Sequence, residues 1–144
     1  MTLKSAALDR ASAIAFKRLE DARGDLASLP EPSRIVAIIY SAKGVIDNGG
    51  FEYFFESDWP GRPPYSLFSD AYRRIGADVA AECIAQATSL FPFADPHLAG
   101  DRRRSFIASL PKHSEFLSLG DSVCGDRRVW EKLEAYVKRH ESAF

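Results

Sequence analysis

The sequence predicts an all-α fold: one compact domain of about seven helices over residues 1–144, with an N-terminal helix in 1–29 and a helical core in 30–144. Two observations lead to this prediction. Apolar residues recur at steps of three and four, the spacing of one helix face, and strand-like alternation is brief where it occurs. No repeat, low-complexity tract or long linker divides the chain, and 144 residues are enough to bury one core.

The first predicted helix ends at a pair of prolines. Its apolar face consists of Leu8, Ala11, Ala15, Leu19, Ala22 and Leu26. Gly24 weakens its last turn. The segment from Leu29 to Pro32 then ends the helix, because proline lacks an amide hydrogen and restricts the residue before it.

The second predicted helix stops at Asn48-Gly49-Gly50. Its apolar face consists of Ile35, Ile38, Ile39, Ala42, Val45 and Ile46. Glycine adopts a positive φ without steric cost, so a positive φ at Gly49 would make that residue essential to the turn. Asn-Gly between apolar runs is also a hairpin signal, but the helical spacing before it favours a helix, a break and a second helix.

The rest of the chain alternates between loops and shorter helices. Residues 57–64 hold three prolines and a glycine, which predicts a loop. Beyond it we expect helices over 65–76, 78–90, 101–110 and 129–140, and a short helical piece that begins at Pro111 and ends at Leu119. Asp78, Asp101 and Asp126 are the expected N-caps, because a short carboxylate accepts hydrogen bonds from the unpaired amides of a first turn.

The overall composition argues against several classes of protein. The 19 basic and 20 acidic residues give a net charge of −1, so we expect no direct nucleic-acid binding. Cys83 and Cys124 are too few and too isolated for a disulfide framework or a metal site. The chain starts without the apolar core of a signal peptide, and no apolar run approaches the ~20 residues of a membrane span. We therefore expect a cytoplasmic protein with no membrane partner.

Charge is unevenly distributed along the chain. Residues 44–100 hold three basic and eight acidic residues, whereas both flanking segments are slightly basic. Within twelve positions that contain no Lys or Arg lie four carboxylates: Asp47, Glu52, Glu56 and Asp58. They form either a solvated helix face or an acidic patch that binds a partner. The basic counterpart is the run of three arginines at residues 102–104. It could bind phosphate or RNA, face solvent, or pair with the acidic middle segment of a second subunit.

No catalytic constellation is recognisable, and we predict that the protein is not an enzyme. His97, His113 and His140 share no metal-ligand spacing, and Gly49-Gly50 follows a helix, unlike a nucleotide-binding turn. We assign no catalytic residue, no metal and no cofactor. A ligand cleft lined by the aromatic residues between 53 and 59 is the alternative, although aromatic residues at this density are typical of a core.

The segment from Val45 to Phe55 carries a distinctive motif. Its characteristic positions are Asn48, Gly49, Gly50, Phe51, Phe54 and Phe55. Three further motifs follow it: Ile75-Gly76-Ala77, Leu90-Phe91-Pro92 and the stretch from Tyr136 to His140. With these motifs, residues 30–144 resemble the bacterial DNA-mimic protein family. That family usually has Gln at position 53 and Asn at position 56, where this chain has Tyr and Glu.

The resemblance implies an all-α homodimer. For the family's characterised member it implies an acidic surface that imitates the DNA phosphate backbone and captures a DNA-binding transcription regulator. In this chain we expect the motif residues to be mainly structural: the corner from Asn48 to Phe51 turns the chain and places Phe51, Phe54 and Phe55 in the core. The neighbouring carboxylates would then be the recognition surface.

These observations favour a protein-binding module that acts through the acidic patch. A protein partner with a basic or DNA-binding surface is expected, since an acidic patch complements it. Three alternatives stay open: a DNA mimic that sequesters a DNA-binding regulator, an immunity or antitoxin-like inhibitor, and a small-molecule-binding or enzymatic domain.

Overall fold

The chain folds around one long central helix, α2. The computed structural model describes residues 5–144, and within this range it contains seven α-helices, three short 3-10 helices and no strand. The α-helices are α1 (Ala6–Asp21), α2 (Glu31–Glu56), α3 (Tyr65–Arg74), α4 (Asp78–Ser89), α5 (Gly100–Ala108), α6 (Glu115–Asp121) and α7 (Arg128–Arg139). The 3-10 helices are η1 (Leu26–Ser28), η2 (Pro96–Leu98) and η3 (Glu141–Ala143). The predicted all-α class is confirmed.

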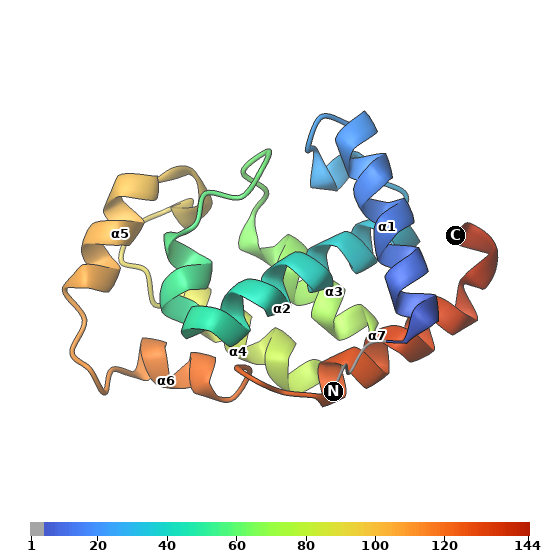
Figure 1. The fold of residues 1–144 in the computed structure, drawn as a ribbon. Coiled ribbons are helices and arrows are strands. Elements are labelled where there is room, and N and C mark those ends of the chain that lie inside the picture. The colour runs from blue at the N-terminus through green and yellow to red at the C-terminus, as the bar shows by residue number, and fades with distance from the viewer. Residues whose placement is uncertain (1–4) are drawn as a thin grey trace.

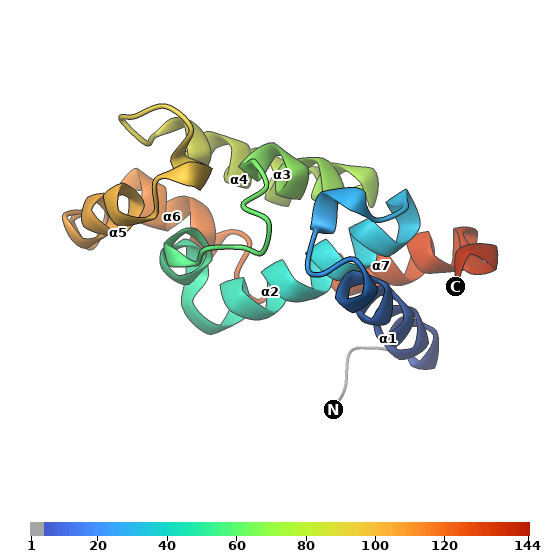
Figure 2. The ribbon, with the colours of Figure 1, turned by 90° about the horizontal axis from the view of Figure 1, so that it is seen from above.

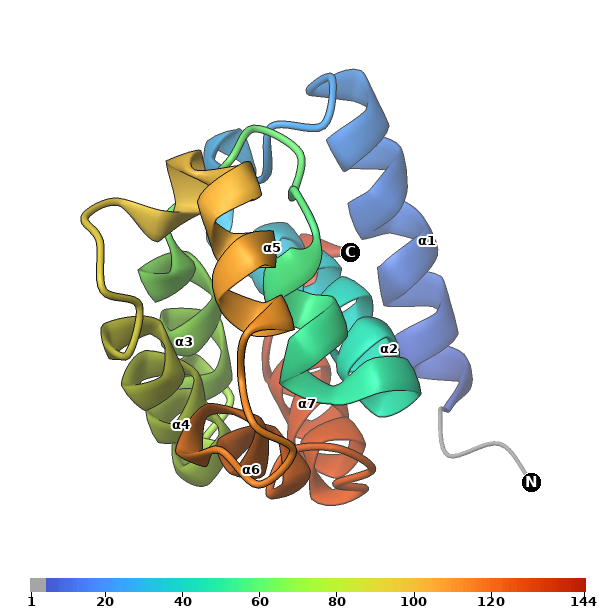
Figure 3. The ribbon, with the colours of Figure 1, turned by 90° about the vertical axis from the view of Figure 1, so that its left-hand side faces the viewer.

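The other helices cover α2 from end to end (Figure 1). α1 and α7 lie at the end where α2 begins, and α5 and α6 lie at the end where it finishes (Figures 1 and 3). α3 and α4 pack against each other along one side of α2 (Figure 2). None of the helices in residues 5–144 combines the length and the apolar character needed to cross a membrane.

α1 is shorter than its apolar stripe predicts. Ser5 caps it, because the side-chain oxygen accepts a hydrogen bond from the amide of Leu8 at 3.2 Å. The helix ends at Asp21, where Arg23 and Gly24 adopt left-handed φ values of 56° and 80°. Leu26 is buried as expected, but it lies in η1 and not in α1. Its spacing from the other apolar residues therefore predicted its burial correctly and its helix wrongly.

The prolines predicted to break the chain also start α2. The helix begins at Glu31 with Pro32 in its first turn, where the missing amide hydrogen costs no helical hydrogen bond. The predicted loop over residues 57–64 is confirmed, because α2 ends at Glu56 and α3 begins at Tyr65.

The predicted helix starts need small corrections. Asp78 and Asp101 lie inside the first turns of α4 and α5, and the N-cap residues are Ala77 and Ala99. α6 begins at Glu115, capped by the Ser114 side chain, so the predicted start at Pro111 was wrong. The Asp126 carboxylate does accept a hydrogen bond from the amide of Arg128, at 3.0 Å, although Arg127 is the residue next to the helix.

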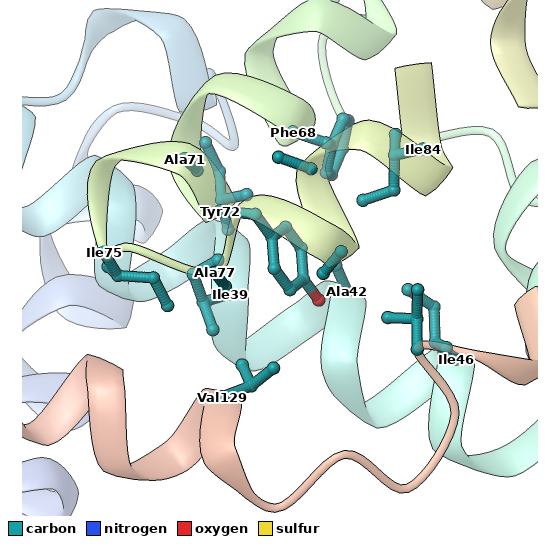
Figure 4. Close-up of a cluster of buried hydrophobic side chains, with 14 of the residues drawn as sticks. Ile39, Ala42, Ile46, Phe68, Ala71, Tyr72, Ile75, Ala77, Ile84 and Val129 are labelled. Carbon is teal, nitrogen blue, oxygen red and sulfur yellow. The ribbon is translucent and has the colours of Figure 1, made fainter. Parts of the chain in front are cut away.

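The core runs along α2 in two parts. Around Tyr72 it is aliphatic and includes Ile39, Ala42, Ile46 and Val129 (Figure 4). The Tyr72 hydroxyl has no hydrogen-bond partner within residues 5–144, and its burial raises the pKa of Tyr72. Around the part of α2 that follows Gly49 and Gly50, the core is aromatic and includes Phe51, Phe54, Phe55, Phe68, Phe91 and Phe116.

Candidate functional site at the kink of α2

The break predicted at Asn48-Gly49-Gly50 is present as a kink inside α2. Gly49 has φ −153° and ψ 16°, and Gly50 has φ 63° and ψ −157°. The positive φ therefore lies at Gly50 and not at Gly49, where we considered it. The conformation of Gly50 belongs to a region that is essentially restricted to glycine, so the kink depends on this residue.

Gly49 is needed for a steric reason, because the ring of Tyr53 occupies the space that a side chain at position 49 would fill. A Cβ placed on Gly49 would overlap this ring, so the ring packs directly on the Gly49 backbone. Tyr53 itself is 54% exposed. A residue that looked like part of an aromatic core is therefore held on the surface by the glycine one turn earlier.

After the kink, the second half of α2 turns its phenylalanines inward. Phe51, Phe54 and Phe55 are each at most 1% exposed. Gly120 of α6 lets the two helices approach closely, since a Cβ there would lie 2.8 Å from the Phe51 amide nitrogen. The motif residues thus join α2 to α6, which is the arrangement expected of structural residues.

Asp47, the first predicted patch residue, is bound within the protein. Its carboxylate accepts a hydrogen bond from Lys43 at 2.9 Å and another from the amide of Gly125 at 2.7 Å. Lys43 is only 2% exposed and its Nζ lies 5.5 Å from the centre of the Trp130 ring. Asp47 therefore fastens α2 to the turn between α6 and α7.

Asp58 is also engaged, by two arginines of α5. Its carboxylate accepts hydrogen bonds from Arg103 and, at 3.2 Å, from Arg104. Hydrogen bonding to Arg103, followed by that to Arg104, lowers the pKa of Asp58 below its usual value. Arg103 and Arg104 therefore pair with the acidic segment of their own chain and not with that of a second subunit, as we considered.

The same arginines complete the end of α2. Arg103 is 1% exposed and donates to the backbone oxygens of Phe55 at 2.8 Å and of Pro96 at 2.5 Å. Arg104 donates to the backbone oxygen of Glu56 at 3.2 Å. The last carbonyl groups of a helix lack helical partners and carry partial negative charge, so arginines suit this position. Arg102 lies over the Phe93 ring instead.

The remaining two predicted carboxylates, Glu52 and Glu56, make no ion pair within residues 5–144. α6 adds two more that sequence reasoning missed, Glu115 and Asp121, also unpaired in this range. Gly120 and Phe51 touch where α6 meets α2, and Asp121 and Glu52 are the next residues along these two helices. Neither residues 44–61 nor residues 113–126 contain a Lys or Arg, a second signal that the sequence offered. We call these four residues the α2–α6 acidic surface.

The cysteines and histidines form no metal site in the described residues. In the described part of the chain no three His, Cys, Asp or Glu residues gather in a way that could hold a metal ion. Cys83 is buried in α4, and burial raises the pKa of its thiol. Cys124 is exposed beside the backbone oxygen of Asp47. His140 lies at the end of α7 with its ring against Tyr136.

Fold and site together define a small all-helical protein whose kinked central helix leaves unpaired carboxylates on the surface. Comparison with family models places it more closely: the chain belongs to the DMP19-like protein family, whose model matches residues 27–140. The resemblance inferred from the motifs is confirmed over nearly the same span. This is not a known family of enzymes. No curated protein and no solved structure matches the chain.

Proposed function

We propose that the protein binds a basic partner protein through the α2–α6 acidic surface. The observation that carries the proposal is that Glu52, Glu56, Glu115 and Asp121 lie on two packed helices with no ion pair in the described chain. Many other carboxylates of the protein, such as Asp21, Glu31 and Asp70, are neutralised by a basic neighbour. Unpaired charges on one surface attract a partner of opposite charge and suppress wrong partners.

The test is capture of partners from a cell extract by three forms of the protein. The first is the wild type, and the second carries Glu52→Lys and Glu56→Lys. The third carries Glu20→Lys and Asp25→Lys, which change the net charge equally but lie around the end of α1, and which have no ion pair in residues 5–144. We expect the same basic protein with the wild type and the third form, and its loss with the second.

DNA mimicry is the second candidate function, and the membership in the DMP19-like family favours it. A DNA mimic occupies the DNA-binding surface of its partner, so double-stranded DNA should displace the captured protein. An immunity-type inhibitor would hold its partner whatever DNA is added. Displacement at a fixed salt concentration separates the two, because salt alone weakens both interactions.

A further inference from the structure

Tyr53 is the large aromatic side chain that the kink of α2 leaves in solvent. The residue is 54% exposed, whereas the next two residues, Phe54 and Phe55, are fully buried. One face of the ring lies on the backbone of Gly49. Within residues 5–144 no other ring and no cation stacks on Tyr53, so a second face is open.

Two carboxylates lie near this ring on the surface of the helix. Glu56 follows at the i,i+3 position, which makes it a neighbour of Tyr53 on the helix surface, and Glu52 lies beside Glu56 at the i,i+4 spacing. The face of an aromatic ring itself carries partial negative charge. The ring and the two carboxylates are thus neighbours on the helix surface, and together they would complement a cation with a flat surface.

We infer that Tyr53, Glu52 and Glu56 bind an arginine side chain of the partner protein. The inference rests on the proposed function and names the group that the acidic surface recognises. A guanidinium is planar, so it stacks on the ring while its N–H edge donates to the carboxylates. A lysine ammonium is a compact point charge and gains less from the same geometry.

The position of the ring is set before the partner arrives. Because the Gly49 backbone supports the ring, Tyr53 does not have to be ordered at the moment of binding. A side chain at position 49 would force the ring to move, although Tyr53 would still be present. A substitution at Gly49 therefore tests the position of the ring, whereas a substitution of Tyr53 tests the ring itself.

The experiment is an NMR titration of the whole isotope-labelled protein with three blocked tripeptides. Their central residues are arginine, lysine and citrulline, the last being the uncharged counterpart of arginine. We expect the arginine peptide to shift the amide signals of residues 49–56 in a saturable way, with upfield ring-current shifts of its own Cδ protons. Citrulline should produce neither effect. Equal shifts with lysine and arginine would overturn the inference, because charge alone would then explain the binding.

Three variants of the protein locate the effect. Tyr53→Leu and Gly49→Ala should each weaken binding of the arginine peptide by about threefold, and Tyr53→Phe should retain it. Gly44→Ala is the control for the added methyl group, since Gly44 lies in the same helix with open space around it. Unchanged binding by Tyr53→Leu in a folded variant, verified by its thermal melting, contradicts the inference.

The capture experiment distinguishes a failure of this inference from a failure of the proposed function. If Tyr53→Leu captures the basic partner as well as the wild type while the Glu52→Lys, Glu56→Lys form does not, the acidic surface stands and the role of Tyr53 is wrong. If both forms capture the partner normally, the proposed function fails and the inference fails with it.

Discussion

Single residues decide the shape of the site, and glycine does so in two distinct ways. At Gly50 the requirement is conformational, because its φ and ψ are closed to other residues while the space around a Cβ is empty. At Gly49 the requirement is steric, because the space is filled by Tyr53. The sequence predicted a break at this pair but could not assign the two requirements, since both residues are glycine.

Gly50→Ala should therefore destabilise the protein, by about 1–3 kcal/mol, through backbone strain alone. Chemical denaturation measures the loss. Gly44→Ala is the matched control in the same helix, where alanine should stabilise by about 0.5–1 kcal/mol because Gly44 is helical and exposed. An unchanged stability of the Gly50 variant would show that the kink relaxes without cost.

Arg103→Met should cost about 3 kcal/mol of stability, because it leaves the backbone oxygens of Phe55 and Pro96 without their donor. Arg102→Met, one residue earlier, removes only a stacking contact on Phe93 and should cost less than about 1 kcal/mol. Thermal melting of the two variants compares them directly. Equal losses would contradict the assignment of Arg103 as the buried cap of α2.

At the scale of elements, helical periodicity predicted which segments are helical, but it did not predict where the helices end or which distant residues they contact. Each predicted helix exists, because apolar spacing reports directly on a buried face. The end of α1 and the start of α6 were misplaced by several residues, because burial continues past a helix end and Pro111 does not have to start a helix. The Lys43–Asp47 pair has i,i+4 spacing and could have been found from the sequence. The hydrogen bond of Asp47 with Gly125 and the ion pair of Asp58 with Arg103 join residues far apart in the chain, and the sequence gave no sign of them.

The junction between α2 and α5 should make stability depend on pH through Asp58. Its pKa is lowered in the folded state, so its contribution is present at neutral pH and is lost as the pH falls from its usual pKa through the lowered one. The difference in melting temperature between the wild type and Asp58→Asn should be largest above about pH 5 and should shrink towards about pH 2. Asp25→Asn, without an ion pair in residues 5–144, serves as the control. A difference that stays constant across this range would show that the charge of Asp58 does not stabilise the junction.

At the scale of the whole molecule, folding sorts the carboxylates into two groups. Of the four patch residues predicted from the sequence, Asp47 and Asp58 hold elements together, and Glu52 and Glu56 have no ion pair within residues 5–144. DNA carries about one charge per 1.7 Å of its axis, so a mimic must gather carboxylates in space. α6 supplies two of them beside α2, and a second copy of the chain, as the predicted homodimer requires, would double the set.

The most direct measurement of the central claim is the dissociation constant of the captured partner for the two charge-reversed forms, side by side at one salt concentration. Because both forms have the same net charge, only the position of the lost carboxylates differs. We predict that Glu52→Lys with Glu56→Lys weakens binding by at least about tenfold, and that Glu20→Lys with Asp25→Lys changes it by less than about twofold. Equal weakening by the two forms would mean that net charge, and not the α2–α6 acidic surface, attracts the partner.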